Sequence, residues 1–147
     1  MKIKYQFLFT ILAFAISALS PVLIPFAIGE DGNLNQMGFA AGMLFWAGIL
    51  LGCICYFLLF QKEKKQIKEV FSEKKTIPGL RFFSNPLGIT ADTMLIVGII
   101  GTVYCANNTQ VNDMVAVLFL VMMLIGIYTH FLFNGTLYRY IREGLQG

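Results

Sequence analysis

Four long apolar segments constrain this chain more than any other feature of its sequence. They cover about residues 7–28, 38–60, 87–106 and 114–133 of a chain of 147. Each segment has roughly 20 residues, enough for a helix with a rise of 1.5 Å per residue to cross a hydrocarbon core of about 30 Å. The sequence therefore predicts an all-α integral membrane protein, a single membrane domain over residues 1–147 folded as an antiparallel bundle of four transmembrane helices.

The positions of the positive charges predict the orientation of this bundle. All eleven Lys and Arg residues precede the first segment, follow the fourth, or lie in the loop 61–86 between the second and third. The two other connections carry the acidic residues Glu30, Asp31 and Asp113 and no Lys or Arg. Because Lys and Arg accumulate on the cytoplasmic side of membrane proteins, we expect both termini and the loop 61–86 to be cytoplasmic, in a bacterial-type plasma membrane.

The same basic residues predict a partner at the membrane surface. Residues this close to transmembrane segments are placed to contact anionic lipid headgroups. The topology explains the net charge of +3, so we expect no nucleic-acid partner. The predicted headgroup contacts are Lys62, Lys64, Lys65, Lys68, Lys74, Lys75, Arg81, Arg139 and Arg142.

Small residues recur along one face of the second segment. At 100° per residue they fall within about a third of the helix circumference, and such a face lets another helix approach closely inside a bilayer. We call this face the glycine seam: Gly38, Ala41, Gly42, Gly48 and Gly52. Packing within the chain is the favoured use of the seam, and contact with another membrane protein or a second copy is the alternative.

Asp92 and His130 are the only Asp, Glu, Lys, Arg or His residues inside the four apolar segments. If the third and fourth helices form a hairpin, both lie at matching depth, near the cytoplasmic surface. One interpretation is an intramembrane polar pair, completed by Thr90, Thr93 and Tyr128. The favoured interpretation is structural, with each side chain close enough to the surface to reach headgroups or Arg81.

Several local signals refine the predicted helices. Pro21 and Pro25 predict a kink in the outer half of the first helix. Ile67, Val70 and Phe71 recur at helical spacing, which indicates either a continuation of the second helix or a separate amphipathic helix on the membrane. Asn134-Gly135 predicts a left-handed end to the fourth helix, followed by a short interfacial turn.

The sequence contains none of the common catalytic signatures. No C-x-x-C motif is formed by Cys53, Cys55 and Cys105. The chain has a single histidine, which provides few ligands for a metal site and only one candidate base for a catalytic triad. We therefore expect no catalytic residues, no cofactor and no metal. The leading hypothesis is a non-enzymatic accessory, regulatory or immunity-type interaction subunit. The alternative is a small homo-oligomeric transporter or channel with a polar site near Asp92 and His130.

Overall fold

The computed structural model describes residues 3–71 and 81–143. In these ranges the chain is helical and has no β-strand, and four helical spans are long and apolar enough to cross a membrane. The elements are α1 (Ile3–Leu19), the 3₁₀ helix η1 (Ser20–Phe26), α2 (Gln36–Phe71), α3 (Pro86–Ala106), α4 (Asp113–Phe133) and α5 (Thr136–Glu143). The expected all-helical membrane architecture is confirmed at this level.

The prolines of the first span change its helix type. The α-helical part ends at Leu19, and residues Ser20–Phe26 continue as a 3₁₀ helix with Pro21 at its start and Pro25 inside it. Each proline lacks the backbone N–H that an α-helix would need at that position, so the tighter 3₁₀ winding takes over. Where the sequence predicted a kink, the structure therefore has a change from α to 3₁₀ winding.

Asparagine side chains start the other three long helices. Asn35 Oδ1 accepts from the backbone N–H of Met37 at 2.8 Å, and Asn112 Oδ1 accepts from that of Met114 at 2.8 Å. Asn85 Oδ1 accepts from Gly88 N at 3.0 Å, and Pro86 occupies the first turn of α3. Each side chain satisfies a backbone donor that has no partner within its own helix.

α2 continues well past its apolar part. Its 36 residues make a helix of about 54 Å. The last turns carry Lys62, Lys64, Lys65 and Lys68, so the first of the two interpretations of this stretch, a continuation of the second helix, is the one observed. Ile67 on this extension and Leu59, near the end of the apolar part, belong to one buried cluster with Leu137 and Tyr140 of α5.

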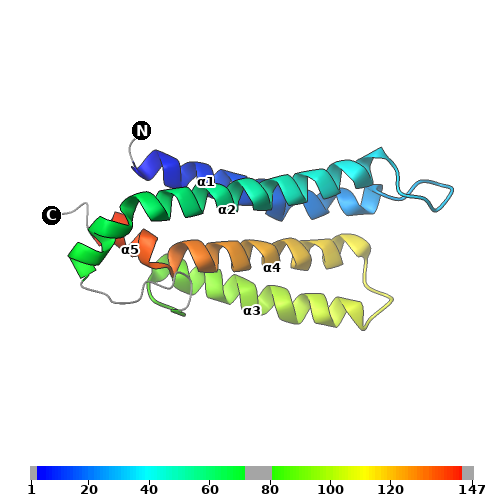
Figure 1. The fold of residues 1–147 in the computed structure, drawn as a ribbon. Helices are drawn as coiled ribbons and strands as arrows, with labels where there is room; N and C mark the ends of the chain where they lie inside the picture. Colours follow the sequence, from blue (N-terminus) through cyan, green and yellow to red (C-terminus); the bar gives the residue numbers. More distant parts are fainter. Residues whose placement is uncertain (1–2, 72–80, 144–147) are drawn as a thin grey trace.

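The helices form two hairpins that lie side by side (Figure 1). α1 and η1 pack on α2, α3 packs on α4, and α4 also contacts η1 and α1. Glycines allow the closest approaches. A Cβ on Gly48 would lie 2.6 Å from Ser17 N and 2.7 Å from Ala13 O of α1, and Cβ atoms on Gly98 or Gly126 would collide with backbone atoms of α4 or α3. Both hairpins are therefore held by direct backbone contact, as expected where lipid supplies little hydrophobic drive between helices.

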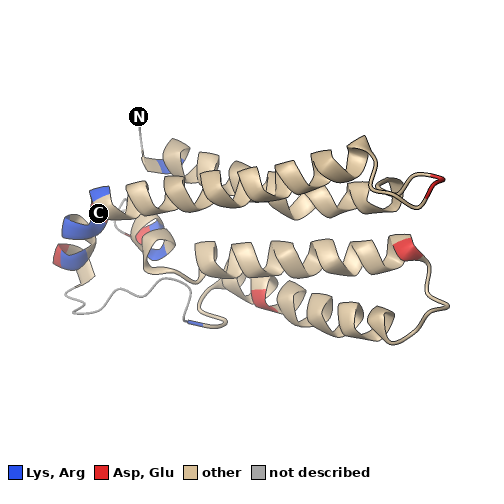
Figure 2. Cartoon of the chain, turned by 45° about the vertical axis from the view of Figure 1, so that its right-hand side comes forward, with Lys and Arg blue, Asp and Glu red and all other residues tan. Residues whose placement is uncertain are grey.

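The basic residues of the described ranges collect at one end of the molecule (Figure 2). This basic end is formed by the start of α1, the extension of α2, residues 81–85 and α5, while the acidic connection 27–35 lies at the opposite end. A buried apolar cluster that includes Phe7, Leu132 and Leu137 is also at the basic end.

Candidate functional site

A buried polar cluster joins the start of α3 to the end of α4. Its centre is the contact between Asp92 and His130, with Nδ1 of the imidazole 2.5 Å from Oδ1 of the carboxylate. The two residues are only 1% and 5% exposed. An imidazole nitrogen without a proton would repel the carboxylate at this distance, so we assign the hydrogen to Nδ1, which donates to Asp92.

Asn134 is the third member of the cluster. Its Nδ2 lies 3.1 Å and 3.2 Å from the two carboxylate oxygens of Asp92 and donates to them. The same Nδ2 lies 3.1 Å from His130 Nδ1, but that contact joins two donors once Nδ1 carries the hydrogen. We therefore treat Asn134 and His130 as parallel donors to one carboxylate, which as an ion is an acceptor only.

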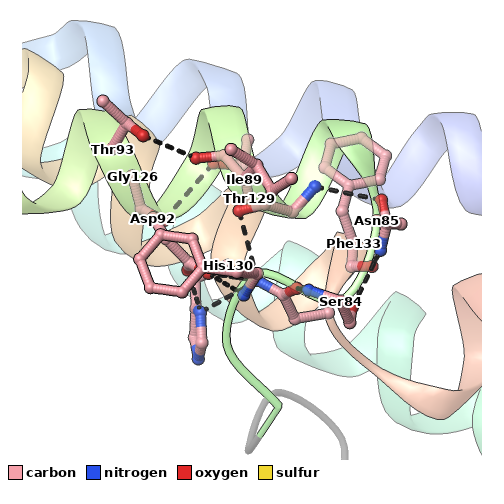
Figure 3. A network of polar contacts seen from close by, with 12 residues as sticks. Ser84, Asn85, Ile89, Asp92, Thr93, Gly126, Thr129, His130 and Phe133 are labelled. Atoms are coloured by element: carbon pink, nitrogen blue, oxygen red, sulfur yellow. Dashed lines mark hydrogen bonds and ion pairs between the residues drawn. The ribbon is translucent and has the colours of Figure 1, made fainter.

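Residues 83–85 complete the cluster from the segment before α3. The backbone N–H of Phe83 donates to Asp92 Oδ2 at 2.6 Å. Ser84 donates to Asn134 Oδ1 twice, from Oγ at 2.8 Å and from the backbone N–H at 3.2 Å, and Asn85 Nδ2 donates to the carbonyl of Phe133 at 2.7 Å. Figure 3 shows these contacts converging from α3, α4 and the segment that precedes α3.

Two backbone features make this geometry possible. Gly88 faces Asn134 so closely that a Cβ at position 88 would collide with the Asn134 amide. Phe83 has a φ of +51°, a left-handed conformation that is uncommon for a residue with a bulky side chain. Such a conformation persists only where surrounding contacts hold it, and here it aims the Phe83 N–H at the carboxylate.

The structure joins Asp92 and His130 directly, as the first interpretation of the sequence proposed. Asp92 is buried among protein groups, whereas the favoured interpretation had it reaching headgroups or Arg81. The hydroxyls expected to complete the cluster have other partners. Thr90 and Thr93 donate to carbonyls of their own helix, and Tyr128 bonds Ser17 of α1 at 2.8 Å.

Sequence reasoning missed the roles of Asn134 and Ser84. Asn134 and Gly135 were predicted to end α4 in a left-handed conformation. The helix does end there, with Asn134 as its C-cap, but the left-handed conformation is wrong. Asn134 has φ −90° and ψ −3°, and the only glycine at positive φ in the described ranges is Gly32. A signal was present, because His130 and Asn134 are four residues apart and share one face of a helix end.

The cluster satisfies its own polar groups and suits a structural role. Three donors surround the Asp92 carboxylate, and the ring of Phe82 lies 4.5 Å from that of His130, centroid to centroid. Within the described ranges no group of three or more His, Cys, Asp or Glu side chains could hold a metal ion. An arrangement of this kind ties two helix ends together, because buried polar groups are costly unless they are paired.

The glycine seam of α2 is only partly used inside the chain. Gly48 and Gly52 face Ser17 and Phe14 of α1, and Ala41 is buried. Gly38 faces Leu34 and the carbonyl of Ala27. A Cβ on Gly42 would meet no atom within 4 Å. One position of the seam is therefore open.

The predicted headgroup-contacting residues lie at the basic end wherever the structure describes them. Lys62, Lys64, Lys65 and Lys68 are on the extension of α2, and Arg81, Arg139 and Arg142 line a common pocket beside Asn134. Lys74 and Lys75 lie outside the described residues.

Comparison of the chain with protein-family models, with curated proteins and with solved structures finds no match.

Proposed function

We propose that this chain is a non-enzymatic interaction subunit of a bacterial-type plasma membrane, an antiparallel four-helix protein with both termini cytoplasmic. Its role would be accessory, regulatory or immunity-type, exerted by binding another membrane protein. The observation that carries the proposal is an apolar groove at membrane depth, in which the glycine seam remains open at Gly42.

The charge distribution supports the orientation. Basic side chains collect at one end of the described structure, and the connection 27–35 at the other end carries Glu30 and Asp31. Positive charge marks the cytoplasmic face, so the basic end is assigned to the cytoplasm.

A pair of cysteine substitutions tests this orientation. Glu30 and Lys68 are both exposed. Glu30 belongs to the connection 27–35 and Lys68 to the extension of α2, and these two segments lie at opposite ends of the molecule (Figure 1). In a background without the native cysteines, Glu30→Cys is expected to react with a membrane-impermeant thiol reagent in intact cells, and Lys68→Cys only after permeabilisation. The reverse pattern would invert the proposed topology.

The groove has the shape and lining of a helix-binding surface. Its volume is about 450 Å³, and it lies between η1, α2 and α4. Gly38, Ala41 and Gly42 form one wall, and Leu120 and Leu124 of α4 form the opposite wall. Gly38 and Gly42 have the spacing of a G-x-x-x-G pair, which permits the close backbone approach that drives helix association in lipid.

We assign the groove to one transmembrane helix of a different membrane protein. The partner helix would place small residues opposite Gly42 and large apolar residues against the remaining walls. Lipid acyl chains can fill such a groove, but they do not form the close backbone-to-backbone contact that a glycine in its wall permits. The open glycine therefore favours a protein occupant over lipid.

Replacing Gly42 by Leu tests the assignment. The side chain enters open space in the isolated chain, so we expect Gly42→Leu to fold normally and to lose stoichiometric copurification of its partner in mild detergent. Ala47→Leu, at an exposed position of the same helix, is the matched control and should retain the partner. Retention of the partner by Gly42→Leu would refute docking in the groove, and recovery of only further copies of this chain would identify a homo-oligomer as the occupant.

The second candidate function is a small homo-oligomeric transporter or channel, favoured by the buried contact between Asp92 and His130. A transporter or channel needs a continuous polar path across the membrane. Beyond the cluster, Gly98, Gly101 and Gly126 bring α3 and α4 into direct contact, which closes a polar path between these two helices. Flux measurements on protein reconstituted into liposomes distinguish this candidate from the interaction role.

A further inference from the structure

A small polar pocket at the basic end opens beside the cluster. Its volume is about 200 Å³, below the roughly 300–1,000 Å³ of typical sites for drug-sized ligands. The pocket is lined by residues from three segments: Arg81 and Ser84 before α3, Asn134 at the end of α4, and Arg139 and Arg142 of α5. We call it the arginine pocket.

Arginine side chains dominate the described lining of the pocket. Three guanidinium groups line it together with the carboxylate of Glu143. Residues Gly135 and Thr136 add the N-terminal end of α5, where backbone N–H groups and the helix dipole favour an anion. Guanidinium groups bind phosphate and carboxylate oxygens in paired geometry.

Glu143 already occupies part of this anion-binding arrangement. Its carboxylate accepts from Arg139 Nε at 3.2 Å and from Arg142 Nη2 at 2.9 Å. Burial works to raise the pKa of Glu143, but hydrogen bonds and charges from both arginines outweigh it and hold the pKa below its usual value. The carboxylate is thus an internal anion that an incoming one would displace.

Several residues that line the pocket are held in place by contacts with other parts of the protein. Ser84 and Asn134, two of its lining residues, are hydrogen-bonded to each other in the buried cluster. Arg139 is further placed by its guanidinium carbon, which lies 4.5 Å from the centroid of the Phe71 ring. Preorganised walls reduce the entropy lost when a small ligand binds.

From this geometry we infer that the arginine pocket binds one phosphate group, and that Glu143 competes with it for Arg139 and Arg142. The pocket lies at the ends of α3 and α4, the depth at which lipid phosphates are concentrated in a membrane. The headgroup of an anionic phospholipid and free inorganic phosphate share this chemistry. The inference is independent of partner docking, because the groove lies toward the other end of the helices.

Native mass spectrometry of the full-length protein in detergent tests the inference, with phosphatidylglycerol and inorganic phosphate titrated separately. The wild type is expected to hold one phosphatidylglycerol. Arg142→Gln is expected to weaken this binding about tenfold, since a charge-assisted hydrogen bond is lost. Lys4→Gln removes the same charge from an exposed position at the start of α1 that does not line the pocket, and should leave the affinity within about twofold.

Glu143→Gln is the second variant of this test. A variant that fails to fold would bind less phosphatidylglycerol, whereas this one is expected to bind more. Removing the competing carboxylate is expected to strengthen binding several-fold. If inorganic phosphate follows the same ranking of variants and phosphatidylglycerol does not, the site is one for free phosphate. Equal binding by wild type, Arg142→Gln and Glu143→Gln, or weaker binding by Glu143→Gln, would overturn the inference.

Discussion

Asp92→Asn is expected to lower the free energy of unfolding by about 1–3 kcal/mol, the usual cost of leaving a buried hydrogen-bonding group without its partner. Asp92 accepts from Phe83 N, His130 Nδ1 and Asn134 Nδ2. An asparagine keeps one acceptor oxygen and turns an NH₂ group toward these donors, so at least one buried donor loses its partner.

A double-mutant cycle measures the interaction free energy between Asp92 and His130. His130→Gln should also destabilise the protein, and the double variant should be little worse than either single one, because each change already removes the same contact. Asp113→Asn, an exposed carboxylate in the first turn of α4, serves as the control and should cost within about 1 kcal/mol. Unfolding by detergent titration in mixed micelles gives the free energies, and additive losses would show that Asp92 and His130 are energetically independent.

Gly48→Leu is expected to separate α1 from α2. The first side-chain carbon would lie 2.6 Å from Ser17 N and 2.7 Å from Ala13 O. Both are backbone atoms, so no change of side-chain rotamer can relieve the clash. Overpacking usually costs about 1–3 kcal/mol, and a clash with backbone belongs at or beyond the upper end of that range. Thermal unfolding in detergent should show the loss directly.

Gly42→Leu is the matched control for this substitution. It makes the same change on the same helix, six residues away, where the structure leaves open space. Its effect on stability should be small, since both variants gain the same helix propensity and only one meets a neighbour. Similar losses in the two variants would mean that α1 and α2 do not pack through Gly48.

Most of the helical framework was predictable from hydropathy and capping residues. The predicted segments 87–106 and 114–133 agree closely with α3 and α4, because Asn85-Pro86 and Asn112 mark where each begins. The first segment was less well predicted. Counting apolar residues does not distinguish α from 3₁₀ winding, and η1 depends on the local effect of Pro21 and Pro25.

Only part of the polar cluster could be predicted from the sequence. Asp92 and His130 stand out because ionisable side chains are rare in apolar segments, and their matched depth follows from counting residues along a hairpin. Asn134 and Ser84 do not stand out, since Asn and Ser are ordinary at helix ends. Whether such a residue caps a helix or turns inward depends on the groups beside it, and these come from a segment about 50 residues away along the chain.

By itself the sequence determined that the chain has four apolar spans, that its basic residues flank the same ends of these spans and that two ionisable residues fall within them. These properties are set by the composition of each segment and by position along the chain. Only the tertiary structure decided that Gly48 faces α1 while Gly42 stays open, and that Arg81, Arg139 and Arg142 share a pocket. Such outcomes depend on how far each helix is rotated about its own axis and on which backbones touch, and in lipid that rotation is chosen by packing between helices.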